Sequence, residues 1–156
     1  MNNFIKLYLL SALSLSFVHA DTVKFGLGSC LDQDFPQPIW DAIGEENLDY
    51  FVFLGDNVYG DVPSGSLRKM VGAYKKQKDL FPKWLDSVEI FPIWDDHDYG
   101  LNDAGSEYPL KRQSQEIFLN FWDISLDDDR HNRDGIYFSE EKIINGKVFK
   151  LIFLDT

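Results

Sequence analysis

Cysteine is almost absent from this 156-residue chain, in which Cys30 is the only one. A single thiol excludes an intrachain disulfide and the small zinc-binding folds that depend on several cysteines. Long apolar stretches are also scarce: residues 7–18 include serines and are fewer than the about 20 that a membrane-spanning helix needs. We therefore expect no stable membrane span. The sequence also contains no repeat, linker or low-complexity segment.

Basic residues are the minority among the charged ones, with 15 Lys and Arg against 26 Asp and Glu, so the formal net charge is −11 at pH 7. This balance argues against nucleic acid or an anionic membrane surface as a partner. The rest of the composition, 44% hydrophobic with 15% aromatic residues, is that of a folded chain and excludes disorder. A chain of this length ordinarily forms one domain with one core.

The first twenty residues have the three parts of a secretory signal peptide. Residues 1–6 are weakly positive, residues 7–18 are apolar, and Val18 and Ala20 are the small residues expected just before a cleavage site. A buried hydrophobic helix is the alternative interpretation. Cleavage after Ala20 removes one lysine and no acidic residue, which leaves residues 21–156 with a charge of −12. We expect an exported protein, periplasmic or extracellular.

The segment Leu27-Gly28-Ser29-Cys30 loosely resembles a lipoprotein cleavage box and offers a rival interpretation. However, Asp21 and Lys24 separate it from the apolar run that a lipobox should join directly, so we expect no lipid anchor. An unpaired thiol in an exported protein is oxidised unless it is buried or bound to something. Cys30 is therefore expected to be either a buried small side chain or a metal thiolate.

Apolar strands alternate with helices along the rest of the chain, which predicts an α/β fold whose sheet is covered by helices. The expected strands are residues 22–27, 50–54, 88–94, 135–139 and 148–154, and the expected helices are residues 38–46, 66–78 and 107–122. Polar residues follow four of the strands: Ser29-Cys30, Asp56, Asp95-Asp96 and Asp155. Because ligands bind at the carboxyl ends of strands in such sheets, these four endings predict one functional rim.

The segment from Gly55 to Tyr59 (GDNVY) is the first candidate metal motif. Gly55 allows a tight turn out of the strand and places Asp56 at its tip. A carboxylate can bridge two cations, and a tyrosinate at Tyr59 is a hard anionic ligand suited to ferric iron. An Asp-Asn turn beside a packed tyrosine is the alternative.

A second cluster, Asp95-Asp96-His97-Asp98, sets three carboxylates and a histidine side by side, and they repel one another unless cations compensate them. A solvated acidic loop is the alternative, although a buried strand and Trp94 directly precede the cluster. An EF-hand does not fit, because Gly100 and Leu101 occupy positions that require an oxygen ligand and a glycine. The mixed-charge tract 127–134 is expected to be a solvated loop, with His131 not a ligand.

These motifs, in this order, resemble those of the alkaline phosphatase D (PhoD-like) metallophosphatases. The matching segments are Gly28-Ser29-Cys30, Gly55–Tyr59, Trp94–Gly100 with Asn102-Asp103, and Leu154-Asp155-Thr156. The Gly-Asp-x-x-Tyr element is also similar to that of purple acid phosphatases and the wider calcineurin-like group. Those enzymes open with an Asp-x-His pair where this chain has Gly-Ser-Cys. The resemblance implies an α/β fold of the calcineurin-like metallophosphoesterase sandwich type.

The resemblance further implies a secreted phosphatase that hydrolyses phosphate mono- or diesters with metal-activated water at a centre of iron and calcium. The implied metal ligands are Cys30 for iron, Asp56 as a bridge between iron and calcium, Tyr59 in the same cluster, and Asn102 for calcium. The implied catalytic residues are Asp96 and His97, with His97 contacting phosphate or protonating the leaving group. Bound cations would also offset the negative charge that otherwise repels a phosphate ester.

The family continues past the Leu-Asp-Thr element with further Asp and His ligands. The resemblance therefore implies that residues 21–156 are a C-terminally incomplete domain, the N-terminal half of the sandwich, monomeric and weakly active or inactive alone. Two alternatives remain open. One is a phosphodiesterase or phospholipase-like specificity at the same centre, and the other is a non-enzymatic exported calcium-binding protein.

Overall fold

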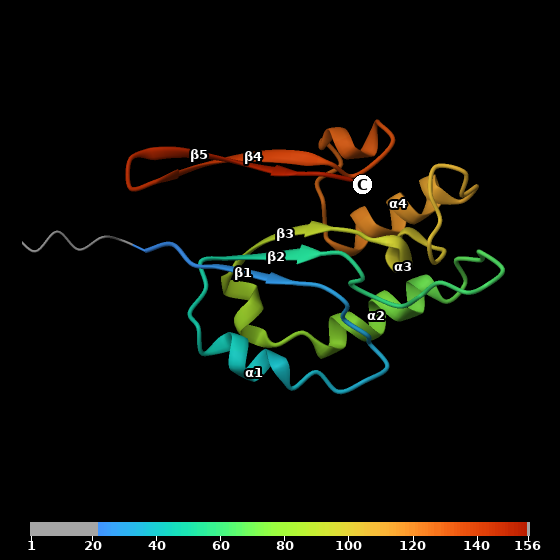
Figure 1. The fold of residues 1–156 in the computed structure, drawn as a ribbon, viewed down its shortest axis with the longest axis horizontal. Coiled ribbons are helices and arrows are strands. Elements are labelled where there is room, and N and C mark those ends of the chain that lie inside the picture. Colours follow the sequence, from blue (N-terminus) through green and yellow to red (C-terminus); the bar gives the residue numbers. More distant parts are fainter. Residues whose placement is uncertain (1–21, 156) are drawn as a thin grey trace, which may run out of the picture.

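Three parallel strands form the central sheet of the structure, a computed structural model that describes residues 22–155 (Figure 1). They are β1 (Phe25–Gly28), β2 (Tyr50–Leu54) and β3 (Glu89–Ile93), and they lie in the order β1-β2-β3. The central strand β2 is apolar throughout, and its three middle residues are buried. The predicted α/β class is thus confirmed, while the predicted signal peptide, residues 1–20, lies outside the described residues.

Helices cover one face of this sheet. The elements are α1 (Ile39–Gly44), α2 (Met70–Leu80) and the short 3-10 helix η1 (Lys83–Ser87), drawn below the strands in Figure 1. Trp40 of α1 and Leu85 of η1 pack against Phe51 and Phe53 of β2, and all four side chains are buried. Burying each aromatic ring here stabilises the folded state by about 1.5–3 kcal/mol. This layer of helices therefore stabilises the sheet.

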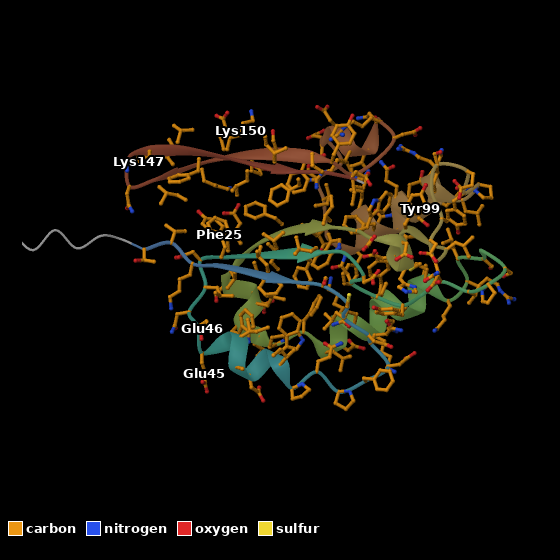
Figure 2. The ribbon with its side chains drawn as sticks, viewed as in Figure 1. Phe25, Glu45, Glu46, Tyr99, Lys147 and Lys150 are labelled. Carbon is orange, nitrogen blue, oxygen red and sulfur yellow. The ribbon has the colours of Figure 1, made fainter. Side chains whose placement is uncertain are left out.

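The last two strands do not join the parallel sheet. β4 (Phe138–Ile144) and β5 (Lys147–Phe153) pair with each other as an antiparallel hairpin. The hairpin lies over the sheet face opposite the helices (Figure 1), where Phe138 and Phe153 pack on Phe91. Phe25 lies in the space between the hairpin and the sheet (Figure 2).

The Asn145-Gly146 turn explains why the hairpin closes on itself. Both residues have positive φ angles, 52° and 73°, as a two-residue hairpin turn requires. The turn pairs β5 with its neighbour in the chain rather than with β3. Three of the four strand endings expected at the rim therefore come from the parallel strands β1, β2 and β3, whereas Asp155 follows an antiparallel strand.

Two helices complete the carboxyl edge of the sheet. The acidic cluster, a possible loop from its sequence, forms the short helix α3 (Asp96–Tyr99). The helix α4 (Lys111–Phe121) begins after Pro109, later than the expected start at residue 107. The reason is that Pro109 disfavours helical backbone in the residue before it. Within residues 22–155, no helix has both the length and the apolar character needed to cross a bilayer.

The tract 127–134 is only partly the solvated loop that its charges predicted. Asp127 and Asp129 are exposed, but Arg130 is 5% exposed and lies in the 3-10 helix η2 (Asp129–His131). Its guanidinium pairs with Asp128 at 2.8 Å and lies 4.2 Å from the centre of the Phe138 ring. The prediction was wrong at Arg130 because a guanidinium can be buried when a carboxylate and an aromatic face both receive it.

Candidate metal centre

The ends of β1 and β2 run side by side past the sheet and bring Cys30 to Asp56. The parallel pairing continues there, since Cys30 N donates to Gly55 O at 3.3 Å and Leu31 N donates to Asp56 O at 2.7 Å. Both Cys30 and Asp56 have left-handed backbone, with φ of 59° and 51°. Such backbone is uncommon in residues other than glycine and tends to occur at functional sites.

Gly55 allows the end of β3 to approach equally closely. Its φ is 104°, and a Cβ at this position would lie 2.5 Å from the backbone nitrogen of Asp95. Any side chain at position 55 would therefore push the ends of β2 and β3 apart. The glycine that the sequence suggested for a tight turn also sets the spacing between two carboxylate-bearing loops.

Asp56 contacts two of the other three predicted ligands, Cys30 and Tyr59. Its Oδ2 accepts from the Cys30 thiol at 3.7 Å and from the Tyr59 hydroxyl at 3.1 Å, while Oδ1 accepts from His97 N at 3.4 Å. Burial and then the Asp56 charge raise the pKa of Tyr59 well above its ordinary value, so the phenol keeps its proton and donates it. A nearby cation would favour the phenolate instead.

Tyr59 is held in place by a residue that the sequence reasoning missed. Gln33, 1% exposed in the loop after β1, accepts from Tyr59 N at 2.8 Å and donates to Tyr59 O at 3.2 Å. No sequence pattern indicates such an amide clamp between loops. These two hydrogen bonds connect the loop after β1 to the loop after β2, in addition to the backbone bonds of Cys30 and Leu31.

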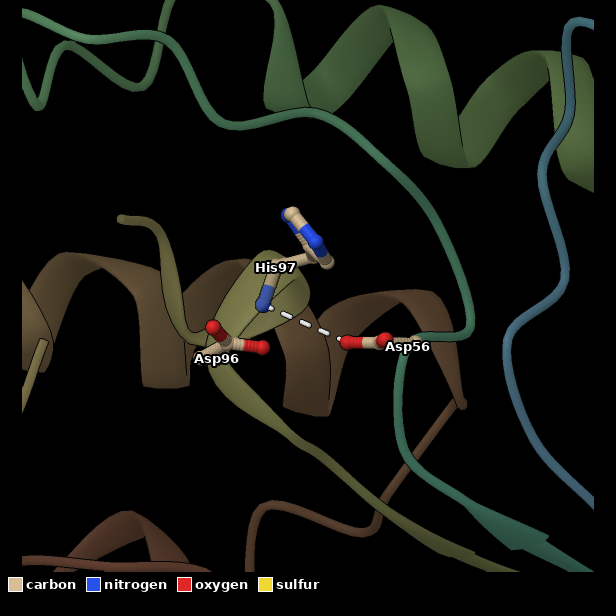
Figure 3. A group of neighbouring side chains, drawn as sticks. All are labelled: Asp56, Asp96 and His97. Atoms are coloured by element: carbon tan, nitrogen blue, oxygen red, sulfur yellow. Dashed lines mark hydrogen bonds between the residues drawn. The ribbon is translucent and has the colours of Figure 1, made fainter. Parts of the chain in front are cut away.

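Asp56, Asp96 and His97 form a cluster whose ligand atoms all lie within 4.8 Å of one another. Figure 3 shows the two carboxylates pointing toward each other and the His97 ring turned away from them. Asp96 is fixed by its neighbours, because its backbone nitrogen donates to Asp95 Oδ1 at 3.0 Å and its Oδ2 accepts from Asp103 N at 2.6 Å. The two predicted residues of the acidic cluster thus lie beside the predicted bridging carboxylate.

The His97 ring contacts Asp61, a second residue that the sequence reasoning missed. Its Nδ1 is 2.9 Å from Asp61 Oδ1, and the ring lies 4.3 Å from the Tyr59 ring. Burial favours the neutral ring, but the hydrogen bond and charge of Asp61, with the charges of Asp56 and Asp96, outweigh it and raise the pKa of His97. One feature of the sequence indicates that Asp61 belongs to the site, namely its position five residues after Asp56 in the segment that follows β2.

Asn102 lies at the margin of this arrangement. Its backbone nitrogen donates to Asp61 Oδ2 at 3.3 Å, and its side-chain amide donates to Asp103 Oδ2 at 2.6 Å. It is therefore tied to the Asp61–His97 pair. The contacts of residues 22–155 do not join Asn102 to Asp56 directly.

A cavity of about 390 Å³ opens beside Asp96 and runs between α3, the start of α4 and the segment before β4. Its lining includes Trp94, Asp96, Lys111, Arg112 and Asp155. Asp155 accepts from Trp94 Nε1 at 2.6 Å, which brings the fourth strand ending to the rim after all. The two cationic side chains donate to main-chain carbonyls of Ser106, His131 and Arg133, which hold them in place without neutralising their positive charge.

The donors at the rim suit a cation. Asp56 is 7% exposed, and among the ion pairs of residues 22–155 no lysine or arginine meets Asp56 or Asp96. Buried carboxylates without a cationic partner are costly unless a metal compensates them. A thiol, a phenol, carboxylates and an imidazole are together a set suited to a transition metal with a harder ion beside it.

The fold and the rim define a mixed α/β protein with a candidate metal centre at the carboxyl edge of its parallel sheet. No protein-family model, curated protein or solved structure matches the chain.

Proposed function

We propose that the chain belongs to an exported metal-dependent phosphatase of the alkaline phosphatase D-like kind, which hydrolyses phosphate mono- or diesters. One observation carries the proposal: Cys30 and Tyr59 both donate to the same buried carboxylate, that of Asp56. These are the residues that the family resemblance implies as ligands, and they come from two separate strand endings. In this proposal the fold is a calcineurin-like sandwich, with the parallel sheet and the facing hairpin as its layers.

The proposed ligands follow from these positions. Cys30, Tyr59 and Asp56 would hold iron, Asp56 and Asn102 would hold calcium, and Asp96 would be a catalytic residue beside them. When bound, such ions provide a Lewis acid and lower the pKa of a coordinated water. The chain's own part is to present anionic donors from rigid strand ends, which reduces the entropy lost on binding.

His97 has the proposed role of proton donor or phosphate contact. Asp61 binds Nδ1, so Nε2 is the nitrogen that can reach a substrate oxygen. Asp61, which is not among the proposed metal ligands, accepts a hydrogen bond from the ring and raises the pKa of His97, which favours its protonated form. A protonated imidazole can donate to a phosphate oxygen or protonate the departing alcohol.

The experiment measures metal binding and hydrolysis on the same samples. Metal-free protein is titrated with Fe³⁺, and a tyrosinate-to-iron charge-transfer band is expected in the visible spectrum. Tyr59→Phe should abolish the band, whereas Tyr50→Phe, at the opposite end of β2, should leave it unchanged. A wild-type protein that stays colourless, or a Tyr59→Phe variant that keeps the band, contradicts the proposal.

Hydrolysis of p-nitrophenyl phosphate and of bis(p-nitrophenyl) phosphate then separates monoesterase from diesterase specificity. Any hydrolysis of either ester, which is expected to be weak at most, should be faster in protein loaded with iron and calcium than in metal-free protein. Activity that survives exhaustive chelation would contradict a metal mechanism. Calcium binding without iron, unchanged by Cys30→Ser, would instead support a non-enzymatic calcium-binding protein.

A further inference from the structure

Asp98 lies directly beneath the candidate metal centre and has no role in the proposed chemistry. Its side chain is fully buried, at 0% exposure. Its Oδ1 accepts from Asp95 N at 2.7 Å, and its Oδ2 accepts from Asn57 N at 3.0 Å and from Asn57 Nδ2 at 2.5 Å. With both oxygens occupied by these donors, this carboxylate faces the protein and is not available to a bound ion.

The positions of these donors in the chain are informative. Asn57 is the residue after Asp56, and Asp95 is the residue before Asp96. One buried carboxylate therefore fixes the main chain next to each of the two carboxylates that point at one another in Figure 3. The Asn57 side chain adds a further tie, since its Nδ2 also donates to Ile93 O at 2.8 Å.

The contact with Asp95 alone has a local explanation. Asp95 and Asp98 form a reciprocal capping box at the start of α3, a common way to satisfy the first amides of a helix. The contact with Asn57 does not belong to that motif, because Asn57 lies 41 residues away and follows a different strand. The carboxylate thus joins two loops and does more than cap one helix.

We propose that Asp98 is a positioning residue that sets the spacing of Asp56 and Asp96 for cation binding. The inference rests on the proposed function only in requiring a metal at this rim. Residues that hold metal ligands through hydrogen bonds usually change metal affinity 10- to 100-fold when replaced. The same loss is expected here, although Asp98 itself touches no ligand.

The test compares Fe³⁺ affinity and the position of the charge-transfer band in three variants. Asp98→Asn keeps the shape but turns an NH₂ group toward backbone N–H donors, so affinity should fall about 10- to 100-fold and the band should shift. Asn57→Ala leaves the capping box intact and removes only the side-chain tie between strands, and it should lower affinity to a smaller extent. Gln77→Leu, which removes a fully buried amide bonded to Gln37, should not change affinity or the band.

The variants also separate positioning from folding. If Asp98→Asn does not fold, Asn57→Ala still tests whether the contact between Asp98 and Asn57 affects metal affinity. This variant retains Asp98 and its hydrogen bonds from Asn57 N and Asp95 N. Unchanged affinity and spectrum in the folded variants, in a wild-type protein that binds iron, would overturn this inference alone. A wild-type protein that binds no iron would overturn the proposed function and this inference with it.

Discussion

Asp61 determines the electrostatic state of His97 more than any other single residue. Its carboxylate is 14% exposed and lies 2.9 Å from the imidazole, whose side chain is 23% exposed. A charge partner so close and so little hydrated stabilises the imidazolium form. Only the backbone nitrogen of His97 contacts Asp56, so the contact between the His97 and Asp61 side chains can be altered without removing Cys30, Asp56 or Tyr59.

Replacing Asp61 with Asn should lower the pKa of His97 in the metal-free protein. The reason is that the substitution removes the negative charge and the acceptor that raise it, while the burial that lowers it remains. A pH titration of the His97 ring by NMR measures the change. Asp134→Asn, an exposed carboxylate without a contact to His97, is the control and should leave the pKa unchanged. A His97 pKa that stays the same or rises in Asp61→Asn contradicts the assignment.

The candidate ligands Cys30, Asp56 and Tyr59 could be proposed from the sequence because each follows an apolar strand. Cys30 and Asp56 end strands that any apolar run would reveal, and Tyr59 follows within one turn. Asp61 and Gln33 could not, because their roles depend on a contact with a segment far along the chain. The residues that follow the strands can be identified from the sequence as candidate site residues. Their hydrogen-bond partners can be identified only from the three-dimensional structure.

Among the elements, η2 shows how a short polar segment can be held in place by one ion pair. Hydrogen bonds from Arg130 lower the pKa of Asp128 to about 2, below its ordinary value of about 3.9. A carboxyl group with a depressed pKa stabilises the fold fully above its ordinary pKa, and that contribution is lost as the pH falls through about 2. Arg130 also packs on Phe138, which links η2 to the start of the hairpin.

Arg130→Met should therefore lower the free energy of unfolding at pH 7 by about 1.5–3 kcal/mol, the usual value of hydrogen bonds to a charged group. The difference from wild type should shrink between about pH 4 and pH 2, as Asp128 takes up a proton. Urea unfolding at several pH values measures both effects. Lys150→Met, which breaks an exposed pair with Glu141, serves as control and should change stability by less than about 1 kcal/mol. Equal losses in the two variants would contradict the role of η2.

Elements with a strong pattern were predicted well, whereas β4 (Phe138–Ile144) was expected at residues 135–139 and α3 was not expected as a helix. The apolar runs of β2 and β3 indicated those strands to within about a residue. The helix α3 has only four residues, too few to display a helical period. Its one sequence signal is the Asp95–Asp98 capping box, which the density of acidic residues around it obscures.

The whole molecule is acidic, and its rim concentrates carboxylates that lack cationic partners within residues 22–155. Metal addition should therefore raise the thermal midpoint of unfolding, because an ion that binds only the folded state stabilises it by mass action. At 100 times Kd the gain is about 2.7 kcal/mol. Circular dichroism with calcium plus iron, against chelator, measures the shift, and Asp56→Asn should reduce it. A midpoint unaffected by metal would contradict the predicted centre.

The arrangement of the two sheets was the part of the architecture that the sequence did not reveal. Alternation of strands and helices predicts a parallel sheet, and three strands form one. Nothing in the composition of β4 and β5 distinguishes a strand that extends that sheet from one that folds over its face. The Asn145-Gly146 turn holds the only relevant information, since it favours pairing between neighbours in the chain.

The two sheets also differ in the order in which they can form. The hairpin joins residues that are close along the chain, such as Ile144 and Lys147, and such hairpins close within microseconds. The parallel sheet must join Phe25 to Tyr50 and Tyr50 to Glu89, contacts of high sequence separation that form slowly. Because Cys30, Asp56 and Asp96 meet only when these distant pairings are complete, we expect the candidate metal centre to be among the last parts of the molecule to assemble.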